Sequence, residues 1–191
     1  MNTPWGESQV AVHLSVGITR HHTASHGGIY VEPIQNNLIP EYMRNADGWY
    51  EEDCEWAKVA VVYPKCFVKN LGNDQQLTEA FTEALSTLRE WFPEAYEHYT
   101  GLQLGAGESH TRDMQLFARA NRDKMVVVSV VNDSEDSSWV ICFAVRGGRG
   151  EDYQYASLDT ATYRIPAVEY QTRTRFGYVV DEDVYKPVQR H

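Results

Sequence analysis

The sequence is short of basic residues. Its 191 residues include 17 Lys and Arg against 27 Asp and Glu, which gives a net charge of −10 at pH 7. Proteins bind DNA and RNA largely through Lys and Arg that replace the counterions condensed on the phosphates. A chain this acidic, without a basic stripe, is a poor candidate for that role, and we expect no direct nucleic-acid partner.

Cysteines and long apolar runs are also scarce. The three cysteines, Cys54, Cys66 and Cys142, are widely spaced and form no CxxC pair, which argues against a zinc ribbon or a redox motif. No apolar run approaches the roughly 20 residues that cross a bilayer. Residues 1–9 lack the basic and apolar regions of a signal peptide. We therefore expect a cytoplasmic protein with reduced cysteines and no membrane partner.

The hydrophobic pattern predicts the α+β class. Residues 9–21 alternate apolar and polar side chains as in a half-buried strand, and residues 27–32 predict a second strand of an N-terminal hairpin. Strand-like runs at 125–131, 138–145 and 152–158 predict a C-terminal antiparallel meander. We expect the sheet to pack against three to four helices. The apolar positions of the first strand share one face: Val10, Val12, Leu14, Val16 and Ile18.

We interpret residues 1–191 as a single α+β domain in three parts. The N-terminal hairpin and loop take residues 1–48, the helical part 49–124, and the C-terminal sheet part 125–191. The clearest helix carries an apolar stripe that keeps helical spacing for four turns, and we expect it to pack against the C-terminal sheet. Its main members are Leu77, Phe81, Leu85, Leu88 and Phe92.

The stretch TASHGG (23–28) places a histidine beside two glycines. In one interpretation, His26 serves a site in which the amides of Gly27 and Gly28 form an anion-binding nest. In the other, which we favour on turn statistics, the glycines supply the positive φ of a turn and His26 only caps backbone groups. Along a strand, His22 and His26 lie too far apart to share an ion without a bend, so we expect no metal.

The stretch WYEEDCEW (49–56) is the second candidate site. Cys54 near a helix N-terminus could act as a thiolate nucleophile with His26 as general base, but four surrounding carboxylates raise a thiol pKa. The same acids could hold Mg²⁺ or Mn²⁺, with Glu51 and Glu55 on one helix face. We favour a solvated cluster that compensates a helix dipole, and we expect no cofactor. The candidate catalytic residues are His26, Cys54, Glu51, Glu52 and Asp53.

Negative charge is concentrated in residues 51–100, which carry four Lys or Arg against ten Asp or Glu. Such a surface can present carboxylates to a basic DNA- or RNA-binding channel of another protein. The opposite charge gathers only around Arg112, Arg119, Arg122 and Lys124. The residues that we expect to take part in binding are Gly27, Gly28, Trp49, Tyr50, Glu79, Glu83 and Glu90.

Four motifs of the chain are distinctive: Pro4-Trp5-Gly6, Ser25–Gly28, Trp49–Asp53 and Pro166–Asp181. Together they resemble a domain family of unknown function. The resemblance covers about residues 2–67 and 160–183, and it rests on these short motifs. Members of that family occur in proteins encoded by bacteriophages, plasmids and integrative elements of proteobacteria. The resemblance implies a mobile-element context and no particular activity.

These observations lead to two hypotheses. The first is a non-enzymatic phage or mobile-element accessory protein in the cytoplasm of a bacterial host. It would bind a host nucleic-acid-handling or defence complex, of the restriction or CRISPR type, and inhibit or redirect it by protein–protein contact. The second is a small hydrolase or transferase that uses His26 with Cys54 or the Glu51–Asp53 cluster. Whether His26 and Cys54 share a pocket separates the two, and the oligomeric state stays open.

Overall fold

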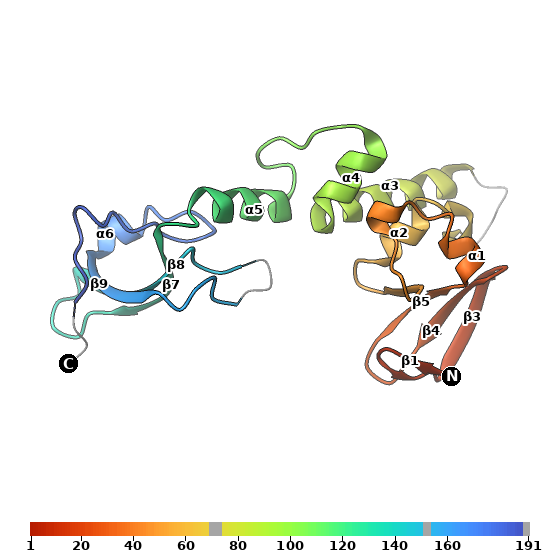
Figure 1. Ribbon diagram of the computed structural model, residues 1–191, viewed down its shortest axis with the longest axis horizontal. Helices are drawn as coiled ribbons and strands as arrows, with labels where there is room; N and C mark the ends of the chain where they lie inside the picture. Colours follow the sequence, from red (N-terminus) through yellow and green to blue (C-terminus); the bar gives the residue numbers. More distant parts are fainter. Residues whose placement is uncertain (69–73, 151–153, 189–191) are drawn as a thin grey trace. The chain divides into compact units, whose positions relative to one another are not determined.

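The computed structural model describes residues 1–68, 74–150 and 154–188 (Figure 1). Within these residues, three antiparallel sheets and six α-helices confirm the α+β class, with strands at both ends of the chain. The fold contains two compact units: unit 1 is Met1–Thr111 and unit 2 is Arg112–His191. None of the helices in the described part of the chain has both the length and the apolar character of a membrane span.

Unit 1 contains two antiparallel sheets and a set of helices. Strands β1 (Asn2–Thr3) and β2 (Gly6–Glu7) form a small hairpin. The larger sheet has the order β3-β4-β5-β6, with strands Val10–Ser15, Ile18–His22, Gly27–Val31 and Trp49–Glu51. The α-helices are α1 (Pro33–Asn36), α2 (Trp56–Ala60), α3 (Asp74–Trp91), α4 (Pro93–Thr100) and the start of α5 (His110–Ala120). Two 3-10 turns, η1 (Glu41–Met43) and η2 (Pro64–Phe67), complete it.

The strand expected at 9–21 is in fact a hairpin. Gly17 has a φ of 71° and turns the chain between β3 and β4, a conformation that glycine adopts without steric cost. The expected buried face is therefore wrong for most of β3, the edge strand: Val10 and Val12 are 52% and 44% exposed. Ile18, which begins β4, is buried in the core.

The apolar stripe of α3 belongs to the core of unit 1, which corrects the expected packing against the C-terminal sheet. Leu88 and Ala84 are fully buried, and three further members of the stripe pack against the same core from its edge. The elements that pack against α3 are α2, α4 and η2. Pro93 begins α4, so α3 ends where the sequence indicates. The partly buried members are Phe81, Leu85 and Phe92.

Unit 2 is built on a three-stranded meander, β7-β8-β9. Its strands are Met125–Asn132, Trp139–Arg146 and Thr160–Pro166, and the short helix α6 (Ala167–Tyr170) follows directly. The third strand, β9, lies later in the sequence than the strand expected at 152–158. Residues 152 and 153 of that run lie outside the described residues, and Tyr155 forms only an isolated bridge to Arg149. Arg112, expected in a basic patch, is buried in this unit.

Candidate functional site

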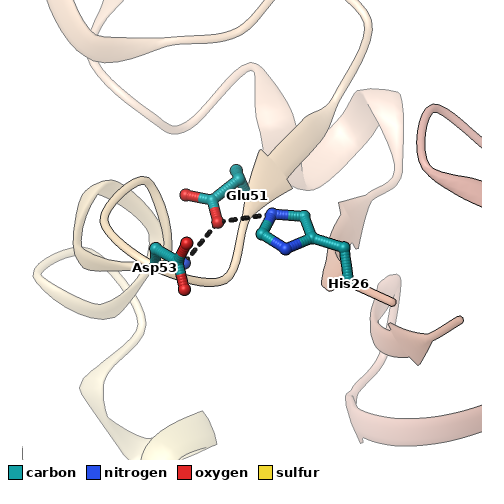
Figure 2. Close-up of side chains that lie close together, drawn as sticks. All are labelled: His26, Glu51 and Asp53. Carbon is teal, nitrogen blue, oxygen red and sulfur yellow. Dashed lines mark hydrogen bonds and ion pairs between the residues drawn. The ribbon is translucent and has the colours of Figure 1, made fainter. Parts of the chain in front are cut away.

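The two candidate motifs meet at one edge of the larger sheet of unit 1. His26 ends the turn between β4 and β5, and Glu51 is the last residue of β6. The register pairs Gly28 with Glu51 across these strands, which brings the histidine and the carboxylate together. Nε2 of His26 lies 2.8 Å from Oε1 of Glu51 (Figure 2). The structure therefore joins residues that are 25 positions apart in the chain.

Glu51 closes the turn that follows β6. Its Oε1 accepts the backbone N–H of Asp53 at 2.6 Å, and its Oε2 accepts the backbone N–H of Cys54 at 3.1 Å. Burial alone would raise the pKa of Glu51, but these hydrogen bonds, the Cys54 thiol and the nearby His26 outweigh it and lower the pKa. Glu51 is therefore a carboxylate at neutral pH.

The acidic residues of this motif do not form the first turn of a helix, which corrects that expectation. Glu51 ends β6, the other three acids lie in the turn before α2, and α2 begins at Trp56 without an acid in its first turn. Glu55 does not join Glu51 in a shared ligand set either. Its carboxylate bonds Nζ of Lys58 at 2.6 Å and the side-chain amide of Asn45 at 2.9 Å. Two of these acids, Glu51 and Glu55, therefore hold the turn through local hydrogen bonds and do not compensate a helix dipole from within its first turn.

His26 is held by its own turn. The hydroxyl of Thr23 donates to the carbonyl of His26 at 2.7 Å and accepts the backbone N–H of His26 at 3.2 Å. The indole of Trp5 meets the imidazole edge-on, with ring centroids 5.7 Å apart. On the other side, Nδ1 lies 3.8 Å from a carboxylate oxygen of Glu52. The ring is thereby fixed between two carboxylates.

Cys54 contacts the same carboxylate as His26 but is poorly suited to nucleophilic attack. Its thiol donates to Oε2 of Glu51 at 3.5 Å, while His26 bonds Oε1. Burial, followed by the charge and hydrogen bond of Glu51, raises the pKa of Cys54 to about 11. At neutral pH the sulfur is therefore a thiol, whereas the reactive form is the thiolate. The two residues share a site, with a carboxylate between them.

Gly27 and Gly28 lie in β5 and not in a turn of positive φ, which corrects the expected reason for these glycines. They are required by close packing. A Cβ on Gly28 would lie 2.2 Å from the Trp5 indole, and one on Gly27 would lie 2.4 Å from Oε2 of Glu52. Both glycines are buried, and Tyr50 is fully buried with its hydroxyl donating to Asn36. These three residues support the site from within and offer little contact surface.

An aromatic cluster surrounds the site. Trp49 lies within 5.8 Å, centroid to centroid, of Trp5, His21 and Tyr30. His21 is buried and its Nδ1 lies 2.9 Å from the hydroxyl of Ser8, and burial is the first cause that lowers its pKa. Trp5 had no assigned role in the sequence, although it stands in the Pro4-Trp5-Gly6 motif. In the sequence, only this motif distinguishes Trp5 from the other tryptophans.

A pocket of about 470 Å³ opens beside the cluster. Glu52 and Asp53 line it from the turn, and Glu83 lines it from α3. Arg20 also lines the pocket and lies over the ring of Phe67, with 5.6 Å between the guanidinium carbon and the ring centroid. The pocket thus combines three carboxylates with an aromatic wall. The remaining lining residues are His22, Ile29, Trp56 and Ala80.

The three acids expected on the outer face of α3 differ in their surroundings. Glu79 and Glu83 are exposed, and Glu79 accepts a hydrogen bond from the side chain of Gln75. Glu90 is half-buried and accepts the backbone N–H of His110 at 3.3 Å. Glu83 is therefore the member of this row that reaches the pocket, and Glu90 serves the fold.

One group of side chains in the described residues has the composition and spacing of a metal site. His26, Glu51 and Asp53 each offer a ligand atom, and these atoms all lie within 4.8 Å of one another (Figure 2). His26 and Glu51 are half-buried, and Asp53 is exposed. His22 is not a member of this group, and its Nδ1 lies 4.0 Å from a carboxylate oxygen of Glu52.

Unit 1 is an acidic α+β domain with a histidine–carboxylate cluster at the edge of its sheet. The model of the domain of unknown function DUF7007 matches residues 1–122, so the chain belongs to that family. The match includes all of unit 1 and thus every residue of the candidate site. Comparison with curated proteins and with solved structures finds no match.

Proposed function

We propose that this chain is an accessory protein of a phage or other mobile element. In this proposal, the acidic surface of unit 1 binds a basic nucleic-acid-binding surface of a host complex. The host complex would be of the restriction or CRISPR type, and binding would inhibit or redirect it without chemistry on the partner. The location would be the bacterial cytoplasm.

The distribution of charge supports a binding role for unit 1. Unit 1 contains six Lys and Arg against fifteen Asp and Glu, whereas unit 2 contains eleven against twelve. Nine of the ten net negative charges therefore belong to unit 1. Charge of one sign on one surface attracts a partner of the opposite sign and raises the association rate.

The observation that carries the proposal is the convergence of Glu52, Asp53 and Glu83 on one pocket. Carboxylates bind a guanidinium or ammonium group with charge-assisted hydrogen bonds, and an aromatic wall adds a cation–π contact. The position of Arg20 over Phe67 already illustrates that contact. A Lys or Arg of a DNA-binding surface has the chemistry that this pocket accepts.

The test compares two charge-reversed variants as baits in a bacterial lysate. Glu79→Lys with Glu83→Lys changes the acidic row, and Glu7→Lys with Glu41→Lys makes the same change in net charge elsewhere on unit 1. We expect the native chain and the second variant to retain a nucleic-acid-binding protein that the first variant loses. Added duplex DNA and rising salt should both release it, because DNA competes for the basic surface and salt screens exposed charges. Identical capture by both variants would contradict the proposal.

A second candidate function is favoured by the 2.8 Å contact between His26 and Glu51. A histidine oriented by a carboxylate is the arrangement of a general base, so a small hydrolase or transferase that uses His26 with the Glu51–Asp53 cluster is the alternative. Loss of function in His26→Ala with an unchanged melting temperature would favour this alternative over the binding role.

A further inference from the structure

The cluster at the sheet edge brings together a nitrogen donor and several oxygen donors. Ligand atoms of His26, Glu51 and Asp53 lie within 4.8 Å of one another. An imidazole suits Zn²⁺ and other first-row transition metals, and carboxylates bind Zn²⁺ and Mn²⁺ as well. The mixed donor set therefore favours a transition metal over Mg²⁺ or Ca²⁺, which prefer oxygen ligands alone.

The charge of the cluster also favours a cation. Among the described residues, the ion pairs of Glu51 and Glu52 are made with His22 and His26 and not with Lys or Arg. The nearby Lys58 is bonded to Glu55 instead. Carboxylates placed this close together repel one another unless a positive charge lies between them.

The ligands are positioned before any ion binds. Thr23 fixes the backbone of His26 from both sides, and the Trp5 ring packs against the imidazole. Glu51 is held by the backbone N–H groups of Asp53 and Cys54. Metal-binding histidines commonly direct their second ring nitrogen to a carboxylate, which fixes the tautomer. Glu52 lies 3.8 Å from Nδ1 on that side of the ring.

We propose that Nε2 of His26 and the carboxylates of Glu51 and Asp53 bind one divalent transition metal ion, Zn²⁺ or Mn²⁺. On binding, the metal takes the place of the direct contact between Nε2 of His26 and Oε1 of Glu51, and Nδ1 of the neutral imidazole carries the ring proton. Three protein ligands leave further coordination positions for water, as in sites that keep an open position. The site shares Asp53 with the pocket proposed to bind a basic partner. Its test uses the protein and metal alone, so the two proposals can fail independently.

The experiment is a calorimetric titration of the purified full chain with Zn²⁺, followed by Mn²⁺ and Mg²⁺. The informative variants are His26→Ala and Asp53→Asn, because Glu51 also closes its turn and its removal would disturb the fold. The controls are His98→Ala, whose ring stacks on Tyr42, and Asp47→Asn, which is exposed at another turn. Melting temperatures confirm that each variant is folded.

We expect one equivalent of Zn²⁺ to bind the native chain and both controls more tightly than Mg²⁺. Loss of an outer-shell group already costs about 10–100-fold in metal affinity, so loss of a ligand should weaken binding at least tenfold in His26→Ala and in Asp53→Asn. The absorption spectrum of bound Co²⁺ should change in His26→Ala and not in His98→Ala. Equal affinity of the native chain and the two ligand variants would overturn the proposal, as would the absence of a stoichiometric site.

Discussion

The indole of Trp5 lies directly against Gly28, in the space that a side chain would occupy. A Cβ on Gly28 would be 2.2 Å from Cη2 of Trp5 and 2.6 Å from the carbonyl oxygen of Tyr50. Trp5 comes from the turn of the β1–β2 hairpin, and Gly28 pairs with Glu51 across the sheet. The packing of a tryptophan onto a glycine therefore links the N-terminal hairpin to the strand that carries the candidate site.

Gly28→Ala should destabilise unit 1. The added methyl group has to displace a ring and a backbone carbonyl, and overpacking of this kind costs about 1–3 kcal/mol. The matched control is Gly105→Ala, whose Cβ would meet only the flexible end of Glu108 at 3.2 Å. The free energy of unfolding in urea measures both variants. An equal effect of the two substitutions would show that the Trp5 ring does not exclude a side chain at position 28.

Leu88→Ala should lower the free energy of unfolding by about 2–5 kcal/mol, through lost burial and the cavity left behind. Leu88 is fully buried in the core of unit 1, whereas Leu102 is 59% exposed. Leu102→Ala should therefore change stability by no more than about 0.5 kcal/mol. A cost for Leu88→Ala as small as that of Leu102→Ala would contradict its place in the core.

The long helix could be predicted from the sequence, but its partner could not. The spacing of Leu77, Phe81 and Leu88 repeats with helical periodicity, and Pro93 limits the helix. Periodicity identifies an apolar face without identifying what covers it, so the expected C-terminal sheet was wrong. The hairpin at β3 and β4 was missed for a similar reason, because alternation continues through Val16 and only Gly17 signals the turn.

The sequence indicates which residues of the two motifs are chemically suited to a site, but not their geometry. The structure places His26, Asp53 and Cys54 around the carboxylate of Glu51, and Glu52 on the other side of the imidazole. The acids were interpreted as a helix start because charge near an apolar segment is typical of one. Pairing of β6 with β5 extends the strand to Glu51 instead, and such long-range pairing leaves no local trace in the sequence.

Stability should fall at alkaline pH because of Tyr50. Burial, the largest cause, raises the pKa of Tyr50 to about 12, against about 10 for an unfolded tyrosine. The unfolded chain therefore releases this proton above about pH 10 while the folded chain retains it. The stabilising contribution is complete below pH 10 and is lost as the pH rises toward 12.

Tyr50→Phe provides the check on this pH dependence. The variant lacks the titrating hydroxyl, so its free energy of unfolding should fall less steeply between pH 10 and pH 12. Other tyrosines with raised pKa, including Tyr63 and Tyr99, should preserve part of the slope. At neutral pH the variant should be less stable by about 1–3 kcal/mol, because Asn36 and the backbone of Asn45 lose a buried partner. An unchanged slope would mean that Tyr50 titrates normally in the folded chain.

Cys54→Ser should leave both the fold and the biological activity intact. A serine hydroxyl can donate to Oε2 of Glu51 as the thiol does, and a hydroxyl–carboxylate hydrogen bond is at least as strong as the bond it replaces. If Cys54 were a catalytic nucleophile, the substitution would abolish activity, because an unactivated serine does not replace a thiolate. Capture of the partner from a lysate and a thermal melt are the two measurements. A folded Cys54→Ser protein that has lost its activity would support the nucleophile hypothesis. Retained activity would mean that Cys54 serves only to close the turn together with Glu51.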